Sequence, residues 1–397
     1  MLTIGGERYV MLQVKDARNL PSVLSSLTND HHGFVAHIIP LNNRLRLGVY
    51  GCDTEKLVYQ IEFADVKEFI SKIRKIFSSN IKSVILQVFD FKDRKYPDNF
   101  KFCLELKQKF EACKIPYYFL SNMNCIIEKA LTATNITVNI GESVMLIYSD
   151  DEWGRTFQYT KDGYEIVQSF TPEILRKIDE TVLRILANHS NLKKIIVSTG
   201  KNQQRFMDLF KSYYPILIDL TSPEYDGKCL IEIHKWILDK SYTKFHAIPT
   251  TPRIYFVTFQ IGETDCNLIL VPPDIKLPVK ASCNCLRSCY NHSIGYHQNE
   301  KLVKYETFKL TEEAHEFKIT LNVDIDCIPS YEVEGIVHDY IVNFPKFCDS
   351  YQFDGIDLRT YAIIGILANR SFLCVNKNGK FEFLETWGGN IFRIAIG

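Results

Sequence analysis

The stretch from Ser83 to Gln168 constrains the fold most, because strand-like and helix-like patterns alternate along it. Ser83–Phe89 is an apolar run rich in β-branched residues, and its length suits a strand buried on both faces. Between Asp98 and Cys113 apolar residues recur every four positions, which predicts a helix beginning near Asp98. We expect further elements at Tyr117–Leu120 (strand), Cys125–Leu131 (helix), Ser143–Tyr148 (strand) and Phe157–Val167 (a hairpin turning at Lys161-Asp162-Gly163). This alternation predicts an α/β fold.

The composition limits the number of domains and the kinds of partner that the chain can be expected to have. The chain has 397 residues, 46% of them apolar, which is enough for two or three domains. The 47 basic and 47 acidic residues cancel, so no general attraction to nucleic acid or to an anionic membrane is expected. No run of about 18 apolar residues and no signal-peptide pattern occur, and the 12 cysteines are scattered, which favours a cytoplasmic protein with reduced thiols.

The order and spacing of these elements resemble the ATPase domain of the 70-kDa heat-shock chaperone family, which has the actin-like, two-lobed nucleotide-binding fold. Val84–Phe91 lies where the family has A-V-[IV]-T-V-P-A-Y-F. Asn122–Cys125 lies at the family's N-E-P-T helix, and Tyr148–Phe157 at its F-D-L-G-G-G-T-F-D-V loop. The resemblance implies an ATPase core over residues 81–248, of a degenerate type because no motif is intact.

The two ends of the chain carry pieces of the family's first lobe. Asp16–Leu24 resembles the stretch that follows the family's first hairpin, and Leu47–Tyr50 is read as its L-I-G-x-x-A strand. Ile364–Val375 resembles the family's opening, I-G-I-D-L-G-T-T-Y-S-C-V, and Asn376–Phe383 the hairpin after it. We therefore expect residues 1–80 to be a truncated segment of lobe I. Residues 343–397 either complete that lobe or begin a second ATPase-like unit.

The second lobe is expected to lack one part of the family's structure. Thr171-Pro172-Glu173 has the cap, proline and acid of a helix start, and it follows the hairpin almost directly. The family inserts a large helical subdomain there, so that subdomain is predicted to be missing. Lys194–Ser198 is a further strand, and Ser222-Pro223-Glu224 resembles N-P-D-E at the start of the last helix.

The region after this core reads as strands. Residues 249–253 contain Pro249-Thr250-Thr251-Pro252 and are expected to form a linker. Residues 254–342 resemble the family's β-sandwich, which grips extended peptides. Leu277–Ser282 stands where the family has I-P-T-K-K-S, and Leu321–Asp326 where it has V-T-F-D-I-D. The helical lid of the family is missing.

ATP hydrolysis on this fold needs carboxylates to hold magnesium and glycine-rich loops that approach phosphate. The Asp of the family's first loop falls on Leu367, and an alternative alignment puts that loop at Gly355–Thr360. The glutamate of N-E-P-T, a water-positioning residue in the family, falls on Met123. The second loop contains the bulky and charged residues Glu152, Trp153 and Arg155. We therefore expect no catalytic residue.

A few positions remain as weak candidates for nucleotide binding. They are Asp150, Asp151, Gly154, Thr156, Thr199 and Gly200. The two acids could hold magnesium, but acids in such a turn are more often solvated. Thr199-Gly200 could contact phosphate, although a strand-to-helix turn needs glycine anyway. ATP and magnesium are thus implied by the resemblance alone, and no other cofactor is expected.

The series Cys283-x-Cys285-x-x-x-Cys289-x-x-His292 has the residue types of a zinc site. However, Cys283 and Cys285 point to the same face of a strand, and the usual Cys-x-x-Cys pair is absent from the series. We expect no metal site. His31, His32 and Asp90 are interpreted as loop residues.

Three hypotheses of function remain. The first is a heat-shock-70-like pseudo-ATPase that acts by binding protein or peptide. The second is a chaperone that hydrolyses ATP with unorthodox loops, and the third is an inactive structural remnant of a tandem copy. The expected partners are unfolded or extended polypeptides and co-chaperones, with no nucleic acid and no membrane.

Overall fold

The structure is a computed structural model and divides into two compact units. The residues described are 2–4, 7–9, 30–77, 80–93, 96, 98–177, 191–261, 264–286, 291–298, 301–310, 314, 316–337, 363–367, 370–377 and 380–383. Unit 1 comprises residues 1–254, 272–279 and 323–329, and unit 2 the remainder. The stretches Asp16–Leu24 and Gly355–Thr360, both used in the family alignment, lie outside the described residues.

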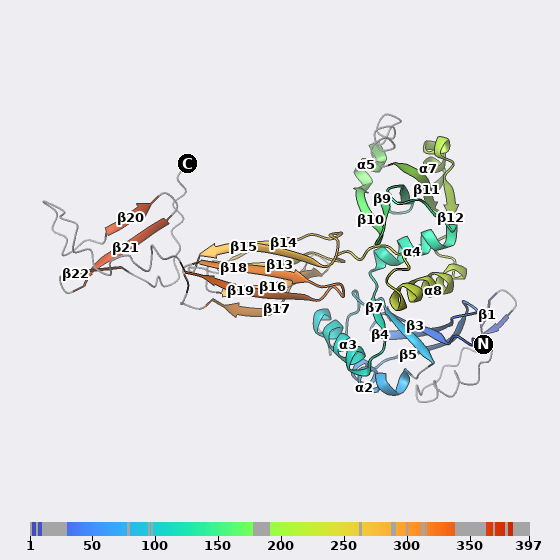
Figure 1. Cartoon of the computed structure of the whole chain (residues 1–397), viewed down its shortest axis with the longest axis horizontal. Helices are drawn as coiled ribbons and strands as arrows, with labels where there is room; N and C mark the ends of the chain where they lie inside the picture. The colour runs from blue at the N-terminus through green and yellow to red at the C-terminus, as the bar shows by residue number, and fades with distance from the viewer. Residues whose placement is uncertain are drawn as a thin grey trace. The chain divides into compact units, whose positions relative to one another are not determined.

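Unit 1 contains two lobes, and the first is built on a five-stranded sheet of order β5-β4-β3-β6-β7 (Figure 1). Its strands are β3 (Phe34–Leu41), β4 (Arg44–Gly51), β5 (Leu57–Phe63), β6 (Ile81–Leu86) and β7 (Tyr117–Phe119). The first three are antiparallel, whereas β6 and β7 run parallel to β3. Two helices connect the strands, α2 (Val66–Ile76) and α3 (Asn99–Cys113). The side chain of Asp98 caps α3, as the sequence predicts.

The second lobe repeats this arrangement with a sheet of order β10-β9-β8-β11-β12. Its strands are β8 (Ser143–Tyr148), β9 (Trp153–Thr160), β10 (Gly163–Phe170), β11 (Leu192–Ser198) and β12 (Ile216–Ile218). The helices are α5 (Pro172–Lys177) and α7 (Gln203–Leu209), with the 3-10 turn η2 (Lys211–Tyr213). Three antiparallel strands followed by two parallel ones occur in both lobes. The α/β class with mixed sheets is therefore confirmed, and the doubled arrangement agrees with the two-lobed, actin-like fold.

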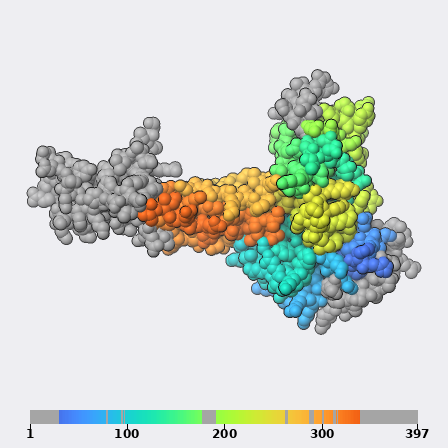
Figure 2. Space-filling model, in the orientation of Figure 1, coloured from blue at the N-terminus to red at the C-terminus, as the bar shows by residue number. Residues whose placement is uncertain are grey.

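Two helices exchange partners between the lobes. Helix α4 (Asn122–Thr134) follows β7 of lobe I, but its residues Ile127 and Leu131 belong to the core formed by lobe II strands. Helix α8 (Glu224–Leu238) follows β12 of lobe II, and it packs Leu230 and Ile233 into the core of lobe I. The two helices also pack against each other, and both lie between the sheets (Figure 1). In the space-filling view the yellow surface of α8 borders both lobes (Figure 2).

The described strands within residues 1–80 include three that belong to the sheet of lobe I. Strands β3 and β4, joined by the turn at Asn42 and Asn43, supply the opening strand-turn-strand of this lobe. Leu47–Tyr50 is therefore part of the second strand of the sheet. The C-terminal strands β20 (Ile363–Leu367), β21 (Arg370–Lys377) and β22 (Lys380–Phe383) form a separate three-stranded sheet and do not extend lobe I. The turn between β3 and β4 has none of the family's loop residues, which the sequence comparison placed at Ile364–Val375.

Unit 2 contains a four-stranded sheet, β14-β13-β16-β17, and a three-stranded sheet, β15-β18-β19. The strands are β13 (Tyr255–Ile261), β14 (Thr264–Val271), β15 (Val279–Leu286), β16 (Asn291–Gln298), β17 (Lys301–Lys309), β18 (Glu316–Val323) and β19 (Pro329–Ile336). The two sheets touch where the rings of Phe308 and Tyr331 stack with centroids 4.1 Å apart. A small pair, β1 (Leu2–Ile4) with β2 (Glu7–Tyr9), begins the chain. Within the described residues, no helix is long and apolar enough to cross a membrane.

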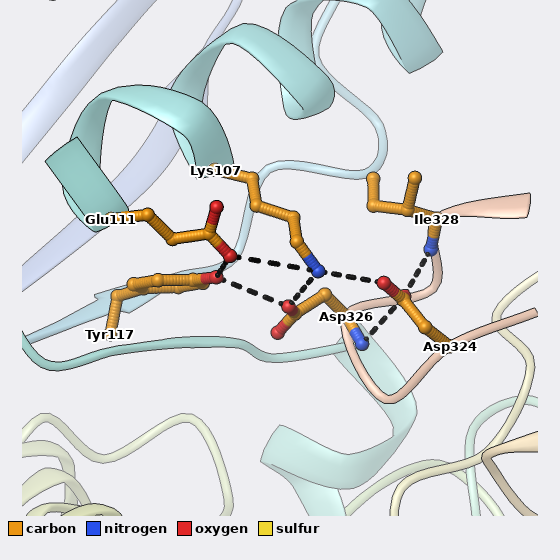
Figure 3. A network of polar contacts seen from close by, with 6 residues as sticks. All are labelled: Lys107, Glu111, Tyr117, Asp324, Asp326 and Ile328. Carbon is orange, nitrogen blue, oxygen red and sulfur yellow. Dashed lines mark hydrogen bonds and ion pairs between the residues drawn. The ribbon is translucent and has the colours of Figure 1, made fainter.

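A polar cluster around Lys107 holds the segment Val323–Pro329 within unit 1 (Figure 3). Lys107 Nζ on α3 donates to Asp324 Oδ2 at 2.7 Å and to Asp326 Oδ2 at 2.6 Å. The hydroxyl of Tyr117 donates to Asp326 as well, at 3.2 Å. Burial raises the pKa of Asp326, and the neighbouring Lys107 acts in the opposite direction. The segment overlaps Leu321–Asp326, the stretch that resembles V-T-F-D-I-D. The sequence did not predict that its aspartates form ion pairs with Lys107.

Because α8 packs into the core of lobe I, a mutation on α8 is expected to destabilise lobe I. Ile233 is buried, so Ile233→Ala should lower the free energy of unfolding by about 2–5 kcal/mol. Amide hydrogen exchange should speed up in β3 and β6 of lobe I, although α8 follows lobe II in sequence. The matched control is Leu238→Ala on the same helix, where the side chain is 57% exposed and the expected cost is under about 0.5 kcal/mol. Faster exchange confined to β8 and β11 would contradict the exchange of helices.

Removal of the Lys107 ammonium is expected to loosen the segment Val323–Pro329 locally. Lys107→Met removes the cation and leaves Asp326 and Asp324 without it, so unfolding free energy should fall by roughly 1.5–3 kcal/mol. Hydrogen exchange at the amides of Asp326 and Ile328, which donate to Asp324 Oδ1, should accelerate. Lys101→Met on the exposed side of α3 is the control. Equal urea midpoints for the two variants would show that the cluster contributes nothing to stability.

Candidate functional site

The ends of the parallel strands are where open α/β sheets usually bind ligands. In lobe II these ends carry two loops, one after β8 that contains Ser149 and Asp150, and one after β11 that contains Thr199 and Gly200. The structure thus brings together three of the six predicted nucleotide-binding residues. We call this pair of loops the lobe II loops.

The lobe II loops are bonded to each other. The backbone N–H of Ser149 donates to Ser198 Oγ at 2.9 Å, and Ser149 Oγ donates to the carbonyl of Ser198 at 2.8 Å. The N–H of Lys201 donates to Asp150 Oδ1 at 2.9 Å. Both serines are buried. The backbone donors and the carboxylate in these loops are therefore engaged within the protein itself.

The remaining donors of the second loop are also used. The N–H of Thr199 donates to the carbonyl of Ile218 at 2.7 Å, and that of Gly200 donates to Gln203 Oε1 at 3.0 Å. A Cβ atom at Gly200 would lie 2.5 Å from both Asp150 Oδ1 and Ser149 Oγ. A side chain at position 200 would therefore displace the Asp150 and Ser149 side chains at the contact between the two loops.

The other three predicted residues lie apart from these contacts. Gly154 and Thr156 are inside strand β9, where they pair with β8 at Ile147 and Met145. Thr156 is 2% exposed and faces no solvent. Asp151 is an exposed turn residue. None of these three positions presents a group toward the loop after β11 in the hydrogen bonds of the described residues.

Glu152 has a structural role that the sequence did not reveal. It adopts a positive φ of 50° and is largely buried. Its Oε1 accepts from Asn202 Nδ2 at 3.1 Å and lies 3.5 Å from Arg205 Nη1, so it ties the β8–β9 turn to α7.

Lobe I has a polar chain at the corresponding strand ends. His37 Nε2 on β3 lies 3.1 Å from Gln87 Oε1, and Gln87 Nε2 donates to Asn122 Oδ1 at 2.7 Å. Asn122 Nδ2 then donates to Asp90 Oδ2 at 2.6 Å, so Asp90 is an exposed residue that anchors the start of α4. Burial lowers the pKa of His37 to about 4, which keeps the ring neutral near pH 7. Sequence reasoning missed His37 and Gln87, because neither belongs to a family motif.

Met123 packs against the apolar core of lobe II. Cys285 Sγ lies 3.8 Å from His292 Nε2, while Cys289 is outside the described residues. His32 lies in an exposed turn and contacts Asp53. Among the residues that the structure describes, no group of three or more His, Cys, Asp or Glu side chains could hold a metal ion.

Comparisons with known proteins show similarity of structure at low sequence identity. No protein-family model matches the chain, and no curated protein matches it in sequence. A ROK-family transcriptional regulator, described as a homologue of the E. coli MLC protein, is 8% identical; the alignment covers 54% of this chain and 82% of that one, with a TM-score of 0.34. The inorganic polyphosphate/ATP-glucomannokinase of Arthrobacter sp. strain KM is 9% identical over 51% of this chain and 98% of its own, with a TM-score of 0.27. The ROK hexokinase of Thermus thermophilus is 8% identical over 50% and 97%, with a TM-score of 0.28.

Proposed function

We propose that this protein acts by binding extended polypeptide, as a heat-shock-70-like protein whose ATPase-like body does not hydrolyse ATP. The observation that carries the proposal is the mutual bonding of the lobe II loops. A nucleotide on such a fold is held by backbone N–H groups and by a carboxylate-bound metal ion. In this protein the equivalent N–H groups of Ser149 and Lys201 already have protein acceptors.

Admitting a phosphate would require these bonds to break. Each intramolecular hydrogen bond of this kind is worth roughly 0.5–1.5 kcal/mol, and more when one partner is charged, as Asp150 is. Asp150 would also repel phosphate oxygens. The thioether of Met123 cannot bind magnesium or accept a proton. These features support a body that serves as a rigid support and not as a catalyst.

Polypeptide binding is supported by strand β19 in unit 2. In the order β15-β18-β19 it forms an edge, so one side of its backbone is not paired within the described part of the sheet. Glu332, Val333 and Glu334 are exposed along it, and Val333 is 40% exposed. An edge with exposed apolar residues can accept an extended chain as an added strand.

The other sheet offers a contrasting edge. Strand β17 carries Lys301, Lys304 and Lys309, and edge lysines are a common means of preventing strand addition. Strand β19 has acidic residues in place of these lysines. We therefore assign polypeptide binding to β19 and expect apolar segments flanked by Lys or Arg to be preferred.

Thermal unfolding tests the absence of nucleotide binding. The midpoint of the purified chain should be the same with and without millimolar ATP and magnesium, because no binding energy is added to the native state. The control is a chain carrying Gly200→Ala, which should melt at a lower temperature since its Cβ separates the lobe II loops. A magnesium-dependent rise for the wild-type protein would overturn the pseudo-ATPase assignment.

Fluorescence anisotropy with labelled peptides tests the polypeptide site. A peptide with a Leu/Val centre and Lys/Arg flanks should bind, and Val333→Asp should weaken it roughly five- to tenfold through lost apolar contact and added negative charge. Val167→Asp is the matched control, because Val167 is similarly exposed (48%) but lies on β10 in unit 1. Equal affinity for both variants would place the site elsewhere than β19.

A further inference from the structure

The two sheets of unit 2 end, on one side of the unit, in strands of opposite charge. Strand β17 (Lys301–Lys309) is an edge of the four-stranded sheet, and β19 (Pro329–Ile336) is an edge of the three-stranded sheet. The ring of Phe308 on β17 stacks on that of Tyr331 on β19, and the Tyr331 hydroxyl donates to Glu306 of β17 at 3.1 Å. The two strands therefore lie side by side, one in each layer (Figure 1). We call them the paired edges.

Each of the paired edges presents an exposed apolar side chain between charged residues of one sign. On β17, Leu302 is 41% exposed, and the exposed residues Lys301 and Lys304 lie on either side of it. On β19, Val333 is 40% exposed between two exposed glutamates. The two strands thus have the same arrangement of apolar and charged side chains, with the sign of the charge reversed.

Part of this charge is not compensated within the chain. Lys304 forms an ion pair with Asp265 of β14 at 2.6 Å. Lys301 and Glu334 form no ion pair among the residues that the structure describes. Lysines on an edge strand deter the addition of a strand of like charge, but an acidic strand removes that repulsion. Opposite charges on adjacent strands contribute roughly 0.2–1 kcal/mol for each pair.

The positions of the paired edges fit a two-fold arrangement of two copies. A two-fold axis perpendicular to this side of unit 2 exchanges the two layers, so that β17 of each copy meets β19 of the other. Such an isologous contact forms both strand pairs at once, and it pairs backbone groups that each edge leaves open within the described sheets. Pairing of β17 with another β17 would instead bring lysines against lysines.

We propose that the paired edges bind a second copy of this chain and form a symmetric dimer, in which β17 of one copy adds to β19 of the other. The lysines of β17 lie against the glutamates of β19, and Leu302 of one copy lies near Val333 of the other. This inference rests on the proposed function in one respect, because it uses the same open edge of β19. It makes self-association a competitor that a bound peptide must displace.

Sedimentation velocity of the full chain tests the dimer. The wild-type protein should be dimeric at about 100 μM, and it should dissociate on dilution or when salt is raised to about 1 M. Glu334→Lys and Lys301→Glu should each weaken the dimer about tenfold or more, because like charges then oppose each other in both contacts. Lys161→Glu is the control, since it reverses an exposed charge in the β9–β10 turn of unit 1 and should change nothing.

Mixing the two charge-reversed variants gives the sharper result. Glu334→Lys and Lys301→Glu should be largely monomeric when each is alone, and their equimolar mixture should dimerise. Each of the two contacts in the mixed dimer again joins a basic to an acidic side chain. A loss of stability in either variant would not produce this recovery.

Three results would overturn the proposal: a wild-type chain that stays monomeric at about 100 μM, a mixture that stays monomeric, and assemblies larger than a dimer. Peptide anisotropy with Lys301→Glu separates the dimer from the polypeptide site, because β19 is unchanged in that variant. Peptide binding by Lys301→Glu together with a monomeric wild type would refute the dimer alone. A wild-type dimer together with no peptide binding by Lys301→Glu would refute the polypeptide site alone.

Discussion

The exchange of α4 and α8 is the contact on which unit 1 depends. Each helix follows the sheet of one lobe and fills the core of the other, so neither sheet is covered by helices of its own lobe alone. Asn124 of α4 adds a polar tie, because its Nδ2 donates to the carbonyls of Ala247 and Ile248. An apolar core shared in this way makes folding of the lobes cooperative. It also joins the two lobes through their apolar cores.

The loops at the strand ends of lobe II are held by bonds within the protein. The pair Ser149–Ser198 joins the ends of β8 and β11, and Glu152 holds α7 through Arg205. Such contacts stabilise one arrangement of the loops.

The buried ionisable groups of unit 1 differ in how completely they are paired. Lys107 meets two aspartates, and Lys129 meets Asp226, so these charges are paired. Glu128 has His246 and one backbone N–H on a single oxygen, although it is among the most buried acids of the chain. A buried carboxylate oxygen without a donor is costly. This imbalance distinguishes Glu128 at the helix crossing from the lobe II loops, where donors and acceptors match.

Local pattern determined much of the secondary structure. The strand Ser143–Tyr148 and the cap at Asp98 agree with the structure, and the hairpin turns at Lys161–Asp162, within the predicted Lys161-Asp162-Gly163. The strand predicted at Ser83–Phe89 is shifted and runs from Ile81 to Leu86. These features depend on residues close together in the chain, so periodicity and capping are sufficient to find them. The six candidate residues were chosen from the resemblance, and the sequence did not predict which groups surround them.

Tertiary structure alone decided the rest. The pairing of β3 with β6, the crossing of α4 with α8 and the bond between Asp150 and the N–H of Lys201 join residues from 47 to roughly 100 positions apart. Nothing in the local sequence of Asp150 distinguishes a solvated acid from one that binds a backbone amide. Likewise, Glu128 lies in an ordinary helical pattern, and only the arrival of His246 and Ala247 from 118 and 119 residues away makes it a buried, half-satisfied acid. Side chains acquire their chemistry from the groups that folding brings around them, and those groups are set by long-range packing.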